Sequence, residues 1–128
     1  MKMKQVPGVF SIGRYDPSQS FECLTSRHFC AVTRTLKEVS IVTESDLLPG
    51  GYDAREDGWA CLQVDGILDF SLTGILSQIS GALASAEISL FAVSTFDTDY
   101  VLVKETTLSQ AKSALARAGI LGRTVLPA

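Results

Sequence analysis

The stretch that decides the fold runs from residue 73 to residue 103 and is TGILSQISGALASAEISLFAVSTFDTDYVLV. Its first part, 73–86, predicts a helix because apolar residues recur there at helical spacing (Ile75, Leu76, Ile79, Leu83 and Ala86). Two short apolar runs follow, over 87–94 and 100–104, and predict strands joined by a hairpin over 95–99. A helix followed directly by two neighbouring strands indicates an α+β fold.

The flanking sequence completes this arrangement. A strand is expected over 67–72, and a second helix follows the hairpin, with a capping box formed by Thr107 and Gln110. Gly119 is expected to end that helix, and a last strand is expected over 120–126. The predicted order is βαββαβ, the ferredoxin-like arrangement, in which two helices cover one face of an antiparallel sheet.

An internal match at an offset of 61 residues links the two halves of the chain. It aligns 31–42 with 92–103 without a gap and places Ala31 on Ala92. Such self-similarity indicates a duplication. We therefore expect two domains, a degenerate one over residues 1–65 and a complete one over residues 66–128, with no linker between them.

The first half predicts the same elements in a reduced form. Four strands are expected (8–15, 27–34, 39–43 and 58–65), with a short helix over 17–24. Pro49 and the adjacent Gly50 and Gly51 exclude a continuous helix where the second helix should lie. A loop is therefore expected over 48–53.

Composition excludes several classes of protein. Hydrophobic residues make up 46% of the 128 residues and charged residues 20%, which is typical of a globular chain. A net charge of -3 argues against a nucleic-acid partner. No apolar run reaches the roughly 18–20 residues of a membrane span, so we expect a cytoplasmic protein without a membrane partner. Cys23, Cys30 and Cys61 lack metal-ligand spacing, so they are expected to be core residues, and neither a metal nor a cofactor is expected.

Catalysis is not expected either. The sole histidine, His28, has no acidic residue within two positions, and the sequence lacks the common hydrolase, zinc-protease, P-loop and dinucleotide-binding motifs. Asp97 and Asp99 offer two carboxylates, whereas a hard cation takes about six oxygen ligands. The residues therefore predict a protein that is not an enzyme.

The start of the 73–86 helix is a candidate ligand site. Unpaired backbone N–H groups and the helix dipole favour a carboxylate at such a position. This helix has no acidic residue of its own, and Gly74 would let a ligand approach the backbone closely. The alternative is that Thr73 caps the helix and Gly74 relieves crowding against the sheet. The residues alone leave both interpretations open.

Two segments resemble a known family. Residues 70–76 and 88–103, above all the run Ser-Thr-Phe-Asp-Thr-Asp-Tyr over 94–100, resemble the ACT domain. More closely, they are similar to stand-alone tandem-ACT bacterial proteins and to CASTOR-type arginine sensors, and 33–42 is similar to the first half of that family. The resemblance implies an α+β fold with two tandem ferredoxin-like (βαββαβ) ACT domains, the first degenerate, with antiparallel sheets and helices on one face.

The resemblance also implies a function. ACT domains bind small ligands, chiefly amino acids, between paired domains, so it implies a regulatory sensor that acts through an unknown protein partner. It implies that the ligand's carboxylate lies at the helix start and that a strand end faces the same cleft; the residues concerned are Leu72, Thr73, Gly74, Ile75, Ser94, Thr95, Phe96, Asp97 and Asp99. The alternative is a structural or oligomerisation module whose ligand site is vestigial. Small residues on the 73–86 helix would also allow a homodimer.

Overall fold

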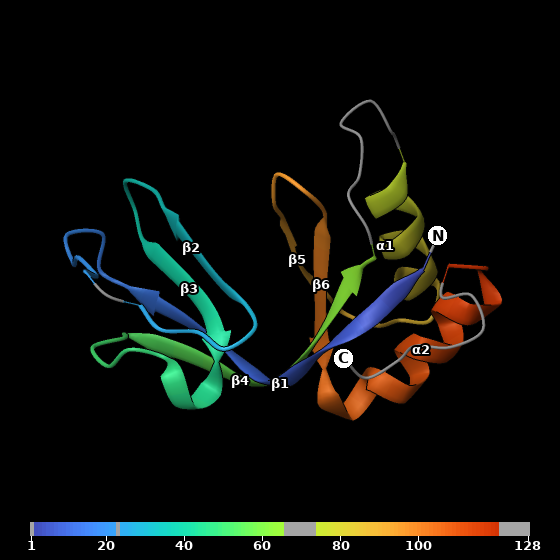
Figure 1. Cartoon of the computed structure of the whole chain (residues 1–128), viewed down its shortest axis with the longest axis horizontal. Helices are drawn as coiled ribbons and strands as arrows, with labels where there is room; N and C mark the ends of the chain where they lie inside the picture. Colours follow the sequence, from blue (N-terminus) through green and yellow to red (C-terminus); the bar gives the residue numbers. More distant parts are fainter. Residues whose placement is uncertain (1, 23, 66–73, 121–128) are drawn as a thin grey trace. The chain divides into compact units, whose positions relative to one another are not determined.

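The computed structural model describes residues 2–22, 24–65 and 74–120 (Figure 1). Its strands are β1 (Met3–Tyr15), β2 (Cys30–Arg34), β3 (Val39–Glu44), β4 (Ala54–Val64), β5 (Phe91–Ser94) and β6 (Asp99–Lys104). Its helices are α1 (Ile75–Ser85) and α2 (Leu108–Arg117), and two short 3-10 turns are η1 (Ser45–Leu47) and η2 (Glu105–Thr107). The strand order is β2-β3-β1-β4-β6-β5, and β3 pairs antiparallel with β1 and β2, as β5 does with β6. This is an α+β fold with an antiparallel sheet and two helices.

The chain forms two compact units. Unit 1 consists of Met1–Pro7 and Ala60–Ala128, and unit 2 consists of Gly8–Trp59. The long strands β1 and β4 each contribute residues to both units. This division departs from the expected boundary between residues 65 and 66, because neither strand ends where one unit passes into the other.

The same strand order occurs in each unit. In unit 2, chain order is β1, β2, β3, β4, and β1 lies between β3 and β4. In unit 1, the end of β4 corresponds to β1 of unit 2, β5 and β6 correspond to β2 and β3, and the start of β1 corresponds to β4. The end of β4 accordingly lies between β6 and the start of β1. The strands expected over 67–72 and 121–126 lie outside the described residues, and Ile120 itself is not in a strand.

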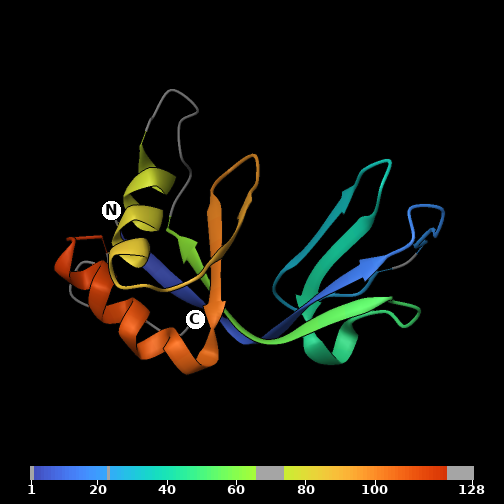
Figure 2. The same cartoon turned by 180° about the vertical axis from the view of Figure 1, so that it is seen from behind.

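In unit 1, α1 and α2 pack on one face of the strands, as Figures 1 and 2 show. Ile79 and Leu83 of α1 and Leu115 of α2 are fully buried in this core. The strand side chains beneath them are Met3, Leu62, Val64, Val101 and Val103. The helical spacing found over 73–86 therefore marks the packing face of α1.

Unit 2 has a smaller core. Tyr15, Val39, Ile41 and Leu48 form it, with Phe21, Leu24 and Cys30 packed against it. The expected loop over 48–53 is confirmed, since these residues lie in no helix or strand. The hydroxyl of Tyr15 donates a hydrogen bond of 2.6 Å to the carbonyl oxygen of Pro49 and fixes this loop to β1.

The short helix expected over 17–24 is wrong for the described residues of that range. Asp16 accepts hydrogen bonds from the backbone N–H of Ser18 (2.9 Å) through its carboxylate and from that of Gln19 (3.0 Å) through its carbonyl oxygen. An aspartate that bonds its own backbone two residues on favours a turn over a helix. Arg34 then binds the carbonyl oxygens of Pro17 and Gln19 from β2.

The two hairpins correspond at an offset of 60 residues, so the sequence match at 61 is wrong by one position. The backbone N–H of Thr35 donates to Glu38 over 2.9 Å, and that of Thr95 donates to Thr98 over 2.8 Å. The 3-10 turns η1 and η2 start at Ser45 and Glu105, which have the same spacing of 60. A strand places successive side chains on opposite faces, so a slip of one residue reverses every facing assignment.

The starts of three elements in unit 1, α1, β5 and α2, differ from expectation. α1 begins at Ile75, and the strand expected over 87–94 begins only at Phe91. The capping box at the start of α2 is wrong, because Thr107 makes no side-chain cap and its hydroxyl donates instead to the carbonyl oxygen of Lys104 (3.0 Å). Gly119 ends the helix as expected, with a left-handed φ of 75°.

Candidate functional site

Gly74, the residue directly before α1, is exposed. Gly74 precedes the helix with a left-handed φ of 81° and ψ of 0°, a conformation that glycine adopts without strain. Among the described residues no side chain caps this helix, and its first turn contains no acidic residue. A Cβ placed at Gly74 would meet no atom of the described residues within 4 Å. Leu72 and Thr73 lie outside the described residues, and Ile75 is half-buried against the core.

The β5–β6 hairpin carries the other predicted site residues. The hydroxyl of Ser94 donates to the Asp99 carboxylate over 2.6 Å, across the strand pair that these two residues form. Thr95 shapes the turn, because its hydroxyl donates to the Thr98 carbonyl oxygen (3.0 Å) and accepts from the Thr98 backbone N–H (3.2 Å). Phe96 and Asp97 are exposed at the tip, whereas Asp99 is half-buried.

Thr98 attaches this hairpin to the sheet. It is 4% exposed, and its hydroxyl donates a 2.7 Å hydrogen bond to the carbonyl oxygen of Val64 at the end of β4. The sequence analysis did not select Thr98, although a threonine between two aspartates in a turn is a recognisable turn signal. The strand ends that flank the turn are therefore held in a fixed position.

The helix start and the hairpin tip lie at the same end of unit 1, as both views show (Figures 1 and 2). The start of α1 and the turn between β5 and β6, which contains Asp97, therefore lie at one end of unit 1. Next to them, burial raises the pKa of Tyr100, and the Cys61 thiol and the Asp97 carboxylate raise it further. The Tyr100 hydroxyl therefore stays protonated near neutral pH.

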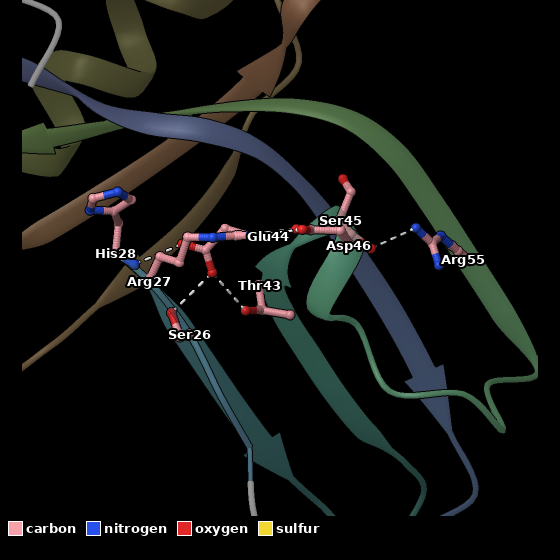
Figure 3. A network of polar contacts seen from close by, with 8 residues as sticks. All are labelled: Ser26, Arg27, His28, Thr43, Glu44, Ser45, Asp46 and Arg55. Carbon is pink, nitrogen blue, oxygen red and sulfur yellow. Dashed lines mark hydrogen bonds and ion pairs between the residues drawn. The ribbon is translucent and has the colours of Figure 1, made fainter.

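A second polar cluster, in unit 2, surrounds Glu44 at the end of β3 (Figure 3). Glu44 is 2% exposed, and its carboxylate accepts hydrogen bonds from the backbone N–H of His28 (2.7 Å), the hydroxyl of Ser26 (3.0 Å) and the hydroxyl of Thr43 (3.1 Å). Next to it, Arg27 forms an ion pair with Asp46. The cluster fixes the segment before β2 to the end of β3.

Hydrogen bonding decides the charge state of Glu44. Burial is the largest single influence and raises the pKa of this carboxyl. The donors of its own backbone, of His28, of Ser26 and of Thr43 together outweigh burial, so the pKa lies below its ordinary value. Glu44 is therefore a charged structural residue. No sequence pattern indicated this role, because a single glutamate at a strand end belongs to no motif.

Arg55 organises a third cluster. Its guanidinium donates to Asp57 (2.6 Å) and to the carbonyl oxygen of Ser45 (3.0 Å), and it lies 5.5 Å from the centre of the Tyr52 ring. Buried Ser11 donates to the Asp57 carboxylate over 2.5 Å. These contacts hold η1 and the 48–53 loop against the strands, which is a structural role.

Metal ligands do not gather in the part of the chain that the structure describes. Within residues 2–22, 24–65 and 74–120, no group of three or more His, Cys, Asp or Glu side chains could hold a metal ion. No described helix is long and apolar enough to cross a membrane.

Comparison with known families identifies the fold. A family model for the ACT domain matches residues 54–117, which is half of the chain. The chain belongs to the ACT-domain family. The match includes all of β4, both helices and the β5–β6 hairpin, and therefore the described part of the candidate site. The resemblance of the sequence to this family is confirmed.

Curated relatives of this ACT-domain chain are sensors. The chain is 38% identical over 60 residues to the human "cytosolic arginine sensor for mTORC1 subunit 1", and the proteins of that name from Bos taurus and Pongo abelii match equally. The match covers 46% of this chain but only 18% of the sensor. The chain thus corresponds to a small part of these relatives.

Solved structures support the fold over nearly the whole ACT-domain chain. A protein from Agrobacterium tumefaciens shares 33% identity, with a TM-score of 0.84 over 98% of this chain and 90% of that one. The regulatory subunit of aspartate kinase from Thermus thermophilus has a TM-score of 0.57 at 14% identity, over 87% of this chain and 93% of that subunit. At that identity the second likeness concerns the fold alone.

Proposed function

We propose that this ACT-domain chain is a non-catalytic sensor of an amino acid that acts in the cytoplasm through a partner protein. Membership of the family and the 38% identity to an arginine sensor support this class of function. Arginine is the first ligand to test, because the name of that relative specifies it. Neither nucleic acid nor a membrane is part of the proposal, in keeping with the net charge of -3.

The site proposed for the ligand lies at the start of α1. Backbone N–H groups near Thr73, Gly74 and Ile75 would hold the ligand's carboxylate, and Asp99 or Asp97 would accept from its ammonium group. The observation that supports this assignment is a helix without an acidic residue in its first turn, preceded by an exposed glycine with a left-handed φ. An anion supplied by a ligand would provide the negative charge that such a helix start favours.

We further propose that unit 2 is a second, degenerate ACT module, which makes the chain a tandem. The shared strand order and the matching hairpins support it. At the offset of 60, Arg34 and Lys37 stand where unit 1 has Ser94 and Asp97. A hairpin with these cations would repel an ammonium group, so we assign the amino-acid site to unit 1 alone.

One observation favours the alternative, a structural module with a vestigial site. The Asp99 carboxylate already accepts a hydrogen bond from Ser94 and therefore has a role in the hairpin without a ligand. The two functions differ in a measurable way, because the structural module would bind none of the twenty amino acids.

The first experiment is a thermal-shift series against all twenty amino acids, followed by calorimetric titration of those that stabilise the protein. A ligand at 100 times its dissociation constant adds about 2.7 kcal/mol to the free energy of unfolding. Stabilisation by arginine or another amino acid, with one molecule bound per chain, is the expected result. Failure of all twenty to bind at millimolar concentration would leave the structural module as the function.

Two pairs of variants then locate the ligand. Asp99→Asn should weaken binding roughly 10- to 150-fold, since a hydrogen bond to a charged group contributes about 1.5–3 kcal/mol. Glu105→Gln removes one exposed charge from the same unit and is the control. Gly74→Val is compared with Gly119→Val, because both glycines have a left-handed φ (81° and 75°) and open space around them. Equal affinity in Gly74→Val and Gly119→Val would contradict the assignment.

A further inference from the structure

The two hairpins present a large apolar side chain at the same point of the turn. Leu36 in the β2–β3 hairpin is 99% exposed, and Phe96 in the β5–β6 hairpin is 80% exposed. Each directly follows the threonine that closes its turn, Thr35 or Thr95. Single exposed apolar residues are ordinary, but here one position carries such a residue in both hairpins.

The backbone of both tips is fixed before any contact forms. The hydroxyl of Thr35 accepts from the backbone N–H of Lys37 (3.1 Å) and of Glu38 (3.2 Å). In the other hairpin the hydroxyl of Thr95 accepts from the N–H of Thr98 (3.2 Å). A pre-organised turn loses little conformational entropy on binding, so even a small contact surface can contribute to association.

The charges beside the two apolar residues are opposite. Lys37 follows Leu36 and Asp97 follows Phe96, and both are exposed. Three other charged residues, Arg34, Glu38 and Asp99, lie near the tips and already have partners within the chain. Arg34 donates to two backbone carbonyl oxygens, and Asp99 accepts a hydrogen bond from Ser94. Glu38 is half-buried, and its backbone N–H donates to the Thr35 hydroxyl. The charge pattern at the tips is therefore cationic in unit 2 and anionic in unit 1.

We propose that the Leu36–Lys37 tip of one copy docks on the Phe96–Asp97 tip of a second copy of this chain. Leu36 would pack on the Phe96 ring while Lys37 meets Asp97, which joins an apolar centre to a charged rim. Complementary charge favours this occupant, because two identical tips would repel each other. A contact of two turns lies well below the 1,200 Å² or so of a stable interface, so the association is weak and transient.

The test uses sedimentation velocity over a concentration series up to the millimolar range, with amino acids removed, so that its outcome does not depend on the proposed ligand site. The wild-type chain should associate reversibly. Lys37→Asp or Asp97→Lys alone should weaken self-association about three- to tenfold, because each places like charges together. Phe96→Ser should weaken it at least tenfold, as loss of an aromatic anchor does. Lys2→Asp and Glu105→Lys are controls for net charge and should leave it unchanged.

Mixing the two charge variants decides where the contact lies. Lys37→Asp carries two acidic tips and Asp97→Lys carries two basic tips, so each should associate with the other more tightly than with itself. This rescue between different molecules requires contact between copies. A wild-type chain that stays monomeric at millimolar concentration would overturn the proposal. So would association that all the tip variants leave intact, or an equimolar mixture that associates no better than its components.

Discussion

The β2–β3 and β5–β6 hairpins have similar turns, but the segments that follow them differ. Each turn is closed by a threonine, and each hairpin continues into a 3-10 turn, η1 or η2. After η2 the chain forms helix α2, whereas after η1 it forms the 48–53 loop. The two backbones therefore diverge at Leu48 and Leu108, where ψ is 123° and -44°.

Three residues account for this difference. After Leu108 the chain continues with Ser, Gln and Ala, which a helix accepts, whereas after Leu48 it continues with Pro, Gly and Gly. Pro49 cannot donate a backbone hydrogen bond, and Gly51 adopts a left-handed φ of 85°. Local sequence thus decides whether a sheet of the same strand order is covered by a helix or by a loop tied to Tyr15.

The largest expected loss of stability comes from a substitution in the core beneath α2. Leu115→Ala removes a fully buried side chain from between α2 and the strands, and should lower the free energy of unfolding by about 2–5 kcal/mol. Leu48→Ala, in the smaller core under the loop, is 9% exposed and should cost less. Urea unfolding followed by tryptophan fluorescence and circular dichroism measures both. A greater loss in Leu48→Ala would mean that the loop, and not α2, dominates stability.

The two hairpins also differ at the end of their second strand, where β3 has the buried Glu44 and β6 has Lys104. Glu44→Ala leaves the donors of Ser26, His28 and Thr43 without their acceptor and should cost about 2–3 kcal/mol. Its counterpart 60 residues on is Lys104, and Lys104→Ala should cost less than about 1 kcal/mol. Urea unfolding at neutral pH compares the two, and equal losses would contradict a special role for the buried carboxylate.

The same residue predicts a pH dependence. The pKa of Glu44 is lower in the folded chain than the ordinary value of about 4.3 for an unfolded glutamate. Its charged form therefore stabilises the fold above that ordinary value, and this contribution is lost as the pH falls through the folded pKa. The difference in stability between wild type and Glu44→Gln should stay constant from pH 7 to pH 5 and shrink below pH 4.

The smallest expected loss of stability comes from the threonine hydroxyl that both hairpin turns contain. Thr35→Val and Thr95→Val remove the same hydroxyl from the same position, and each should cost about 0.5–1.5 kcal/mol. Thermal unfolding monitored by circular dichroism compares them with the wild type. Losses that differ by more than about 1 kcal/mol would show that the two turns are not equivalent.

The sequence predicted α1, α2 and the β5–β6 hairpin of unit 1, because these segments have clear periodicities. Ile79 and Leu83 lie on the apolar face predicted for the 73–86 helix and are fully buried. It could not predict the capping of α2, since the Thr107 hydroxyl has a competing acceptor in the Lys104 carbonyl oxygen. The sequence alignment at 61 also failed, because the identity of Ala31 with Ala92 outweighed the weaker signal of two equivalent turns.

For the candidate site, sequence reasoning selected an exposed helix start and an acidic hairpin, and both exist among the described residues. It did not find the bond between Ser94 and Asp99 or the attachment of Thr98 to Val64. Neither contact has a sequence signal, since each depends on a strand register and on a strand from elsewhere in the chain. That a ligand's carboxylate binds the backbone N–H groups at the start of α1 stays a prediction.

The sharing of β1 and β4 between the units has a consequence for synthesis. Gly8–Trp59 is continuous and leaves the ribosome as one piece, so unit 2 can fold while the rest is still being translated. Met3–Pro7 must wait for residues made much later, because the core that includes Met3 also contains Leu115 and Ile120. An expression clone cut between residues 65 and 66 would therefore separate unit 1 from both strands that begin its sheet. A stable fragment is more readily obtained from Gly8–Trp59 than from residues 66–128.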